Sequence, residues 1–289
     1  MIYKLKPILK QRLWGGKFLP KIYGQNTKEK IGEAWILSCL GNDNCFVNKT
    51  ETLLDLFNAN PNIVAKGYSG SFPLLVKLID AQDDLSIQVH PNIKTEFWHI
   101  LNKKPSKLYM GFKQNTTKAQ VQKSLMDSKV TTLLNHVDVV NGDSYLINPG
   151  TIHAIGKKTF LIEIQQSADI TYRLYDFNRL DVNGKPRQLH IKEALKCINY
   201  NQLSVAKKQT TEQLVACPYF HVYKYGLKDS LEFNADNNSF QAIVVLDGKG
   251  SIKFNKQKLV FKPYDTFFIP AGSGQYKLTG KGTIIRITL

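Results

Sequence analysis

Apolar and polar residues alternate with a period of two along most of the chain, and Gly, Pro and Asn residues interrupt the alternation at short intervals. This period is typical of β-strands with one buried face, and many short strands at close spacing indicate a sandwich or barrel. Helical periodicity is confined to residues 50–67, 116–137 and 190–199. The pattern therefore predicts a mainly β protein with a few short helices.

One phrase of the sequence recurs towards the C-terminal end. Residues 142–155 (GDSYLINPGTIHAI) and residues 264–278 (YDTFFIPAGSGQYKL) both predict a strand, a Gly-containing turn and a second strand. We interpret this weak repeat as two related jelly-roll barrels. We expect a larger domain over residues 1–205, with a small helical insertion at about residues 116–137, and a smaller β domain over residues 206–289.

The composition narrows the class of protein. The chain has 289 residues, of which 43% are hydrophobic and 11% aromatic, so a substantial core is available. It lacks a run of about 18 apolar residues, and its first ten residues lack the apolar segment of a signal peptide, so we expect a cytoplasmic protein without membrane contact. The cysteines are scattered, and we expect buried thiols rather than disulfides at Cys39, Cys45, Cys197 and Cys217.

The formal charge of +16 would suit a nucleic-acid partner. However, the basic residues are spread along the sequence without a basic run or a nucleic-acid-binding motif, so we expect no nucleic-acid partner. Two interpretations of the charge stay open. Either it reflects a proteome rich in Lys, or it provides a positive field that attracts a small anion such as a sugar phosphate.

Candidate metal ligands are concentrated in residues 84–100 (DLSIQVHPNIKTEFWHI). Gln88 and His90 share one face of a strand, and a hairpin would bring Glu96 to the same face. His153, which follows a Pro-Gly turn early in another strand, is the candidate for a fourth ligand. Two imidazoles, a carboxylate and an amide oxygen suit one zinc ion that keeps an open position for water or substrate.

The other four histidines are not assigned to this site. His99 has the opposite parity to Glu96 along its strand, so we expect it to pack or to support the site from outside. No constellation of ligands or catalytic groups is predicted around His136, His190 or His221.

Six long motifs carry a family resemblance. They are RLWGGKFLPKIYG (12–24), GEAWILS (32–38), FPLLVKLIDAQDDLSIQVHPN (72–92), KTEFW (94–98), NPGTIHAIG (148–156) and IEIQQSADITYRLYDFNR (162–179). Together they resemble the type I phosphomannose isomerases, most closely the short bacterial form, from about residue 7 to residue 195. Members of that family usually carry a longer insertion where this chain has only Asn92 and Ile93 between two of the motifs.

The resemblance implies a fold and a reaction. The fold would be two cupin-like jelly-roll barrels, with the few short helices inserted in and following the first, catalytic one. The family binds one zinc ion through a Gln, a His, a Glu and a His, which match Gln88, His90, Glu96 and His153. The implied reaction interconverts mannose 6-phosphate and fructose 6-phosphate by proton transfer through a cis-enediol.

The resemblance also implies roles for residues of the pocket. Arg173 would lie near the reacting carbons, Glu163 is the first choice for the general base, and Lys94 is the matching pocket lysine. Contacts with the substrate would come from Trp14, Lys94, Asp169 and Arg173.

Two other classes of function stay open from the sequence. One is a non-catalytic, metal-containing cupin that binds a sugar phosphate. The other is an iron-dependent cupin dioxygenase, because two histidines and one carboxylate also suit iron. The expected partner of an isomerase or of a sugar-phosphate-binding cupin is a small-molecule sugar phosphate. We expect a monomer or a homodimer.

Overall fold

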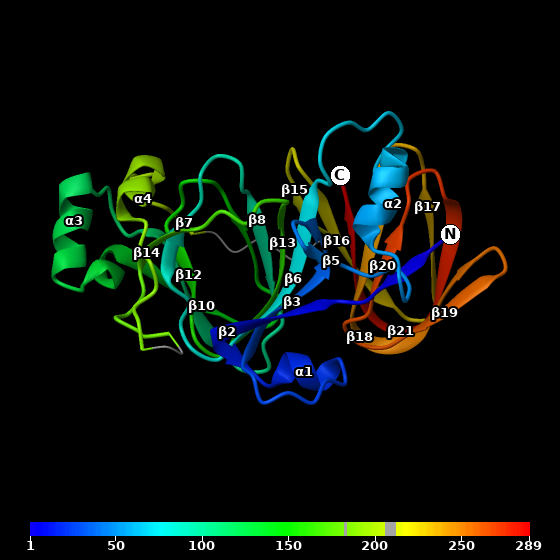
Figure 1. Cartoon of the computed structure of the whole chain (residues 1–289), viewed down its shortest axis with the longest axis horizontal. Coiled ribbons are helices and arrows are strands. Elements are labelled where there is room, and N and C mark those ends of the chain that lie inside the picture. Colours follow the sequence, from blue (N-terminus) through cyan, green and yellow to red (C-terminus); the bar gives the residue numbers. More distant parts are fainter. Residues whose placement is uncertain (182–183, 206–211) are drawn as a thin grey trace. The chain divides into compact units, whose positions relative to one another are not determined.

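The computed structural model describes residues 1–181, 184–205 and 212–289, and most of its regular elements are strands (Figure 1). Two compact units can be distinguished. One comprises Met1–Ile8, Trp35–Val76 and Gln209–Leu289, and the other comprises Leu9–Ala34 and Lys77–Lys208. The boundary predicted between residues 205 and 206 adjoins a segment outside the described residues, and it stays a prediction.

Two sheets carry the candidate site, and most of their residues belong to the unit of Leu9–Ala34 and Lys77–Lys208. A five-stranded sheet has the order β10-β9-β12-β7-β14, and a six-stranded sheet has the order β11-β8-β13-β6-β3-β2. The strands of the first are β7 (Ile87–Val89), β9 (Ser106–Phe112), β10 (Leu134–Val139), β12 (His153–Ile155) and β14 (Tyr172–Tyr175). Those of the second are β2 (Ile8–Gly16), β3 (Ile31–Leu37), β6 (Leu74–Ala81), β8 (Glu96–Ile100), β11 (Ser144–Ile147) and β13 (Thr159–Gln166).

The two sheets enclose a common apolar core. Leu108 and Ile155 of the five-stranded sheet pack with Trp98 and Leu161 of the six-stranded sheet in one buried cluster. Burial of large apolar side chains from both layers is the main favourable contribution to such a sandwich. The site residues described below occupy inward-facing positions of the same strands.

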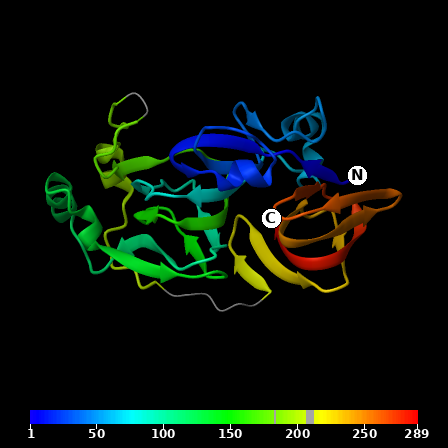
Figure 2. The ribbon, with the colours of Figure 1, turned by 90° about the horizontal axis from the view of Figure 1, so that it is seen from below.

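Helices cover the opposite face of the five-stranded sheet. Helices α3 (Lys118–Met126) and α4 (Ile191–Cys197) contribute Val121, Ala194 and Leu195 to a cluster with Ile87 and Val89 of β7. In both ribbon views these helices lie at the same end of the sheet (Figures 1 and 2). The remaining helical segments are α1 (Phe18–Ile22), α2 (Leu53–Ala59) and the 3₁₀ turns η1 (Pro61–Ile63) and η2 (Val130–Leu133).

Local sequence signals explain where the helices lie. Thr52 and Thr117 each form a capping box with the residue three positions on, at the start of α2 and α3. The helical prediction over residues 116–137 is wrong beyond residue 133, because β10 begins at Leu134 and pairs with β9. Burial alternates from Asn135 onward, which is the period of a strand.

The other unit is centred on an eight-stranded sheet with the order β1-β20-β18-β21-β16-β15, in which β17 pairs with β21 and β19 pairs with β18. Its strands are β1 (Tyr3–Leu5), β15 (Gln213–Ala216), β16 (His221–Leu227), β17 (Ser230–Ala235), β18 (Gln241–Phe254), β19 (Gln257–Phe261), β20 (Thr266–Ile269) and β21 (Gly274–Thr288). Two short strands, β4 (Cys39–Leu40) and β5 (Asp43–Asn44), form a separate pair.

The two copies of the repeated phrase have the same local structure. Each consists of a strand, a turn and a strand, namely β11 to β12 and β20 to β21. Each turn contains a glycine with positive φ, Gly150 at 78° and Gly272 at 73°, a conformation that a side chain disfavours. The second copy places Phe267, Tyr276 and other large side chains in the core of its unit. Of the two copies, only the first contributes a residue, His153, to the group of candidate metal ligands found among the described residues.

Along the three described ranges of the chain, every helix is too short or too polar to cross a bilayer.

Candidate functional site

The segment over residues 84–100 does not form the predicted hairpin. Strands β7 and β8 lie in different sheets, because both edges of each are already paired, β7 with β12 and β14 and β8 with β11 and β13. The link between them turns tightly, with the amide of Lys94 donating to the carbonyl of Pro91 at 3.2 Å. The chain therefore crosses from one sheet to the facing sheet, and its polar side chains meet across the space between the two.

The predicted alternation holds within the strands even though the hairpin does not form. Ile87 and Val89 face the helices, whereas Gln88 lies opposite His153 in the register of β7 and β12. On β8, Trp98 faces the core between the sheets, as its neighbour Glu96 does. Each strand thus presents its polar positions to the interior of the sandwich.

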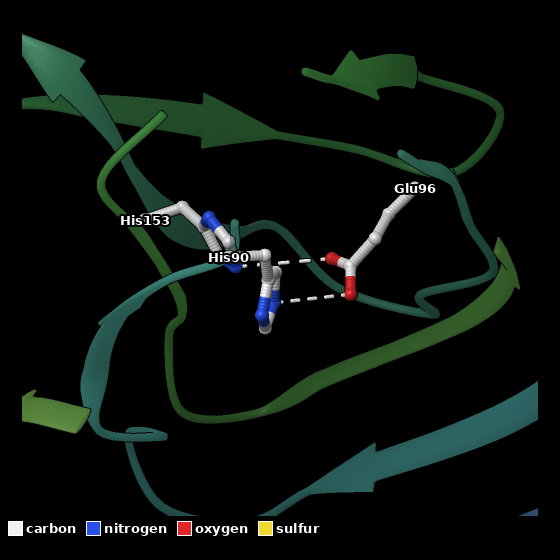
Figure 3. A group of neighbouring side chains, drawn as sticks. All are labelled: His90, Glu96 and His153. Carbon is white, nitrogen blue, oxygen red and sulfur yellow. Dashed lines mark ion pairs between the residues drawn. The ribbon is translucent and has the colours of Figure 1, made fainter. Parts of the chain in front are cut away.

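Three residues converge at this place, as Figure 3 shows. Nε2 of His90 lies 3.1 Å from one oxygen of Glu96, and Nε2 of His153 lies 3.7 Å from the other. The three potential ligand atoms all lie within 4.8 Å of one another, and all three side chains are buried. His90 follows β7, Glu96 begins β8 and His153 begins β12, so the cluster joins both sheets.

Backbone carbonyls fix both imidazoles. Nδ1 of His90 lies 2.8 Å from the carbonyl oxygen of Ile170, and Nδ1 of His153 lies 2.8 Å from that of Thr151. A carbonyl only accepts, so each Nδ1 carries a hydrogen and each ring turns its Nε2 towards Glu96. This second contact is the one that orients histidine ligands in metal sites.

The charges of the cluster agree with this assignment. Burial and the neighbouring His90 lower the pKa of His153 to about 3, which keeps its ring neutral. Burial alone would raise the pKa of Glu96, but His90 and Lys94 hold it well below its ordinary value. The Nζ atom of Lys94 lies 3.0 Å from the Glu96 carboxylate. The cluster therefore combines two imidazoles, of which that of His153 is neutral, with an ionised carboxylate.

These donors fit a divalent cation. Nε2 of His90 and one oxygen of Glu96 are buried and lack a hydrogen-bond partner among the residues that the structure describes. A bound cation would satisfy these buried atoms, because a neutral Nε2 and a carboxylate oxygen are both ligands of divalent metal ions. The amide nitrogen of Gln88 lies 3.4 Å from Nε2 of His153. Because amide oxygen and nitrogen are interchangeable in such assignments, Gln88 can offer its oxygen as a fourth donor.

A pocket of about 1240 Å³ opens beside the cluster. Of the site residues predicted from the sequence, only His90 and His153 are absent from the lining of this pocket. The other seven line it: Trp14, Gln88, Lys94, Glu96, Glu163, Asp169 and Arg173. The structure thus brings all the predicted site residues into one place, and their individual roles stay proposals.

Glu163 lies in a buried hydrogen-bond network in the lining of the pocket. One of its oxygens is 3.1 Å from Nζ of Lys77, and the other accepts a hydrogen bond of 2.9 Å from Nε1 of Trp98. Burial, and then the charge of Glu96, raise the pKa of Glu163, against the opposing effect of Lys77 and Lys94. Glu163 is therefore held in one orientation and is easier to protonate than an exposed glutamate.

Trp14 forms a fixed wall of the pocket. It is buried. A Cβ atom at position 32 would lie only 2.4 Å from its ring, so the ring fits only because residue 32 is a glycine. The carbonyl of Trp14 also accepts hydrogen bonds from the amides of Gln82 and Asp83. Asp169 differs in being exposed at the pocket.

Several pocket residues were not selected from the sequence. Arg12 forms a two-pronged ion pair with Glu33 at 2.9 and 3.0 Å. Lys77 is a charged residue within the apolar strand β6, a local anomaly that the sequence does display. His190 and Arg187 also line the pocket, although they lie outside the quoted motifs, and no local signal marks them. The unassigned His99 contacts the Ser144 hydroxyl at 2.8 Å.

The sheets and the site together define a class, that of cupin-type proteins with a candidate metal centre beside a polar pocket. Family models agree: residues 210–289 match the model described as "Mannose-6-phosphate isomerase, cupin domain", and residues 2–123 match "Phosphomannose isomerase type I, catalytic domain".

Known proteins are similar over nearly the whole chain. The mannose-6-phosphate isomerase ManA of Bacillus subtilis is 33% identical over 302 aligned positions, which cover 95% of each chain. The crystal structure of the mannose 6-phosphate isomerase from Bacillus subtilis superposes with a TM-score of 0.90 at 30% identity, over 100% of this chain and 99% of that one.

A more distant structure shows the same fold. The structure of a putative mannosephosphate isomerase from Archaeoglobus fulgidus has a TM-score of 0.81 at 22% identity, over 99% of this chain and 96% of that one.

The chain belongs to the type I phosphomannose isomerase family, a family of aldose–ketose isomerases. The family resemblance and the mainly β, cupin-like fold class predicted from the sequence are thereby confirmed.

Proposed function

We propose that this chain is a zinc-dependent isomerase that interconverts mannose 6-phosphate and fructose 6-phosphate through a cis-enediol. The observation that carries the proposal is the buried cluster of His90, Glu96 and His153, which adjoins a pocket that also contains a buried glutamate and basic side chains. An aldose–ketose isomerisation moves one proton between two carbons while negative charge develops on the neighbouring oxygens. A site for it therefore needs a base and positive charge in one pocket.

His90, Glu96 and His153, together with Gln88, would hold one zinc ion. Two nitrogens, one carboxylate and one amide oxygen match the ligands and the open position that catalytic zinc sites use. When bound there, zinc supplies a Lewis acid that stabilises negative charge on a substrate oxygen without any redox change.

Glu163 would move the proton between the two carbons. Its raised pKa brings the carboxyl group closer to neutral pH, where it both accepts and returns a proton readily. Lys77 and Trp98 each bind one of its oxygens, which fixes the orientation of the carboxylate. Because Glu163 occupies an inward-facing position of β13, it reaches the same space as Glu96 on the neighbouring strand β8.

Positive side chains would bind and stabilise the anionic substrate. Lys94 keeps its ammonium group at the Glu96 carboxylate and faces the pocket. Arg173 directs Nη1 to the carbonyl of Gln188 at 2.7 Å, and its buried Nε lacks a hydrogen-bond partner within the described part of the chain. Further basic residues that line the pocket are Arg12, Lys28, Lys30, Arg179 and Arg187. Carboxylates line the same pocket, and Arg12, Arg179 and Arg187 are ion-paired with Glu33 and Asp176, so the preference for a sugar phosphate over a neutral sugar would come from directed contacts and not from net charge.

Trp14 and Asp169 would contact the sugar itself. The fixed ring of Trp14 provides an apolar surface, and the exposed carboxylate of Asp169 provides acceptors for sugar hydroxyl groups.

An isomerase assay tests the function directly. We expect the zinc-loaded protein to convert mannose 6-phosphate to fructose 6-phosphate and to leave unphosphorylated mannose unchanged. A chelator is expected to remove this activity and added zinc to restore it. Mass spectrometry of the purified protein identifies the metal. Tight binding of mannose 6-phosphate without turnover would favour a sugar-phosphate-binding cupin, and oxygen consumption with bound iron would favour a dioxygenase.

Replacement of Arg173 by Ala is expected to leave the metal content unchanged and to lower kcat by about a hundredfold or more. The reason is that Arg173 lines the pocket without belonging to the histidine–carboxylate cluster. The matched control is Lys192→Ala, which removes a positive charge from an exposed position on α4. A kcat equal to that of the wild type in Arg173→Ala would remove Arg173 from the reaction.

A further inference from the structure

His190 is tied to Arg173 by two hydrogen bonds. The amide of His190 donates to the carbonyl oxygen of Arg173 at 2.7 Å, and the amide of Arg173 donates to Nδ1 of the His190 ring at 3.3 Å. The guanidinium of Arg173 also donates to the carbonyl of Gln188, two residues before His190. Residues 188–190 thus run beside β14 and hold both the backbone and the side chain of Arg173.

These contacts define the tautomer of His190. A backbone amide can only donate a hydrogen bond, so Nδ1 of the ring must be the acceptor and carry no hydrogen. In the neutral ring the hydrogen therefore resides on Nε2, because the partner of one ring nitrogen determines the state of the other. Nε2 has no hydrogen-bond partner among the residues described in the structure, and His190 is half-buried in the lining of the pocket. The ring consequently offers a donor that the protein itself does not use.

The surroundings favour an anionic or strongly polar ligand atom. Arg173 and Arg187 line the same pocket as His190, and Arg187 is also ion-paired with Asp176. A neutral Nε2–H donor adds to this positive region without adding another charge that would repel the arginines. The Nε2–H donor of His190 also differs from the arginine donors in having a fixed direction, because the hydrogen bond at Nδ1 holds the ring.

We propose that His190 binds the substrate directly, donating its Nε2–H to an oxygen of the sugar phosphate while Nδ1 keeps the ring in register with Arg173. This inference rests on the proposed function, since it assigns another residue to the same pocket. It adds a neutral, oriented hydrogen-bond donor to the charged groups described above.

Two isosteric variants separate the two nitrogens. Asn places an acceptor near the position of Nδ1 and lacks the distal donor, whereas Gln places an amide N–H near the position of Nε2 and lacks the proximal acceptor. We expect His190→Asn to raise KM for mannose 6-phosphate about tenfold or more, with a smaller change in kcat, and His190→Gln to stay much closer to the wild type. His136→Asn, which alters an exposed histidine outside the pocket lining, is the matched control and is expected to leave KM unchanged.

Calorimetric titration with mannitol 6-phosphate, which has no carbonyl group and cannot be isomerised, gives a second readout that does not depend on turnover. The affinity is expected to fall in His190→Asn in parallel with the rise in KM. Competition by inorganic phosphate locates the acceptor: weaker inhibition in this variant places it on the phosphoryl group, and unchanged inhibition places it on the sugar.

Wild-type affinity in His190→Asn would overturn the proposal. A loss of affinity in His190→Gln alone would also overturn the proposal, because the ring would then act only by holding Arg173 through Nδ1. Failure of the proposed function is distinguishable, since the wild-type protein would then bind mannose 6-phosphate without converting it, and the comparison of affinities would still apply.

Discussion

Replacing Glu96 by Gln is expected to remove the bound metal and to lower isomerase turnover at least about a thousandfold. Glu96 is the only carboxylate in the described cluster, and it supplies the negative charge opposite two imidazoles. Gln keeps the size of the side chain but has no charge, so the cation would lose its main electrostatic partner. Metal content measured by mass spectrometry, beside the turnover rate, checks both parts of this expectation.

Glu163→Gln provides the matched control for metal binding. It removes a second buried carboxylate from the same pocket, but Glu163 does not belong to the ligand cluster. We expect this variant to retain a full equivalent of metal. Full metal content in Glu96→Gln would contradict the assignment of Glu96 as a ligand. Loss of metal in both variants would mean that any buried negative charge in the pocket supports metal binding, whether or not the carboxylate is a ligand.

The sequence predicted the local features of the site and not the way in which they meet. The side-chain parity around Gln88 and Glu96 follows from the geometry of a single strand, so it could be predicted without knowledge of the fold. The predicted hairpin does not form, because the pairing of a strand depends on partners far away in the sequence. Here β12 and β14 occupy the edges of β7, and β11 and β13 occupy those of β8.

The consequence of this pairing is a site built across two layers. Three of the four proposed ligands, Gln88, His90 and His153, come from the five-stranded sheet or its end, and Glu96 comes from the facing sheet. A hairpin would have placed the carboxylate and the first histidine on one flexible ribbon. In the observed arrangement the apolar core between the sheets fixes the distance between them.

The residues that the sequence did not reveal are those whose role depends on the order of the strands or on a distant segment. Lys77 is visible as a charge within an apolar strand, yet its contact with Glu163 depends on the order of β6 and β13. His190 gives no local signal, because its importance arises from β14, 17 positions earlier in the chain. The family motifs identified the pocket but end before His190.

Replacing Glu163 by Gln is expected to lower kcat about a hundredfold or more while the protein keeps its fold and its metal. The amide has nearly the same shape and can still accept a hydrogen bond from Trp98, but it cannot take a proton from carbon. Glu193→Gln, at an exposed position on α4, is the control for removal of a carboxylate elsewhere and is expected to leave kcat unchanged. Substantial turnover in Glu163→Gln would require a different base.

The pH dependence of turnover gives an independent test of Glu163. A base must be ionised to act, and burial raises the pKa of Glu163 above its ordinary value. Activity is therefore expected to fall as the pH decreases through a value higher than that of an exposed glutamate. Lys77 lowers this pKa, so Lys77→Met is expected to move the acid limb of the profile of kcat against pH to higher pH. An acid limb that stays in place in Lys77→Met, in a variant with full metal content, would show that a group other than Glu163 controls the profile.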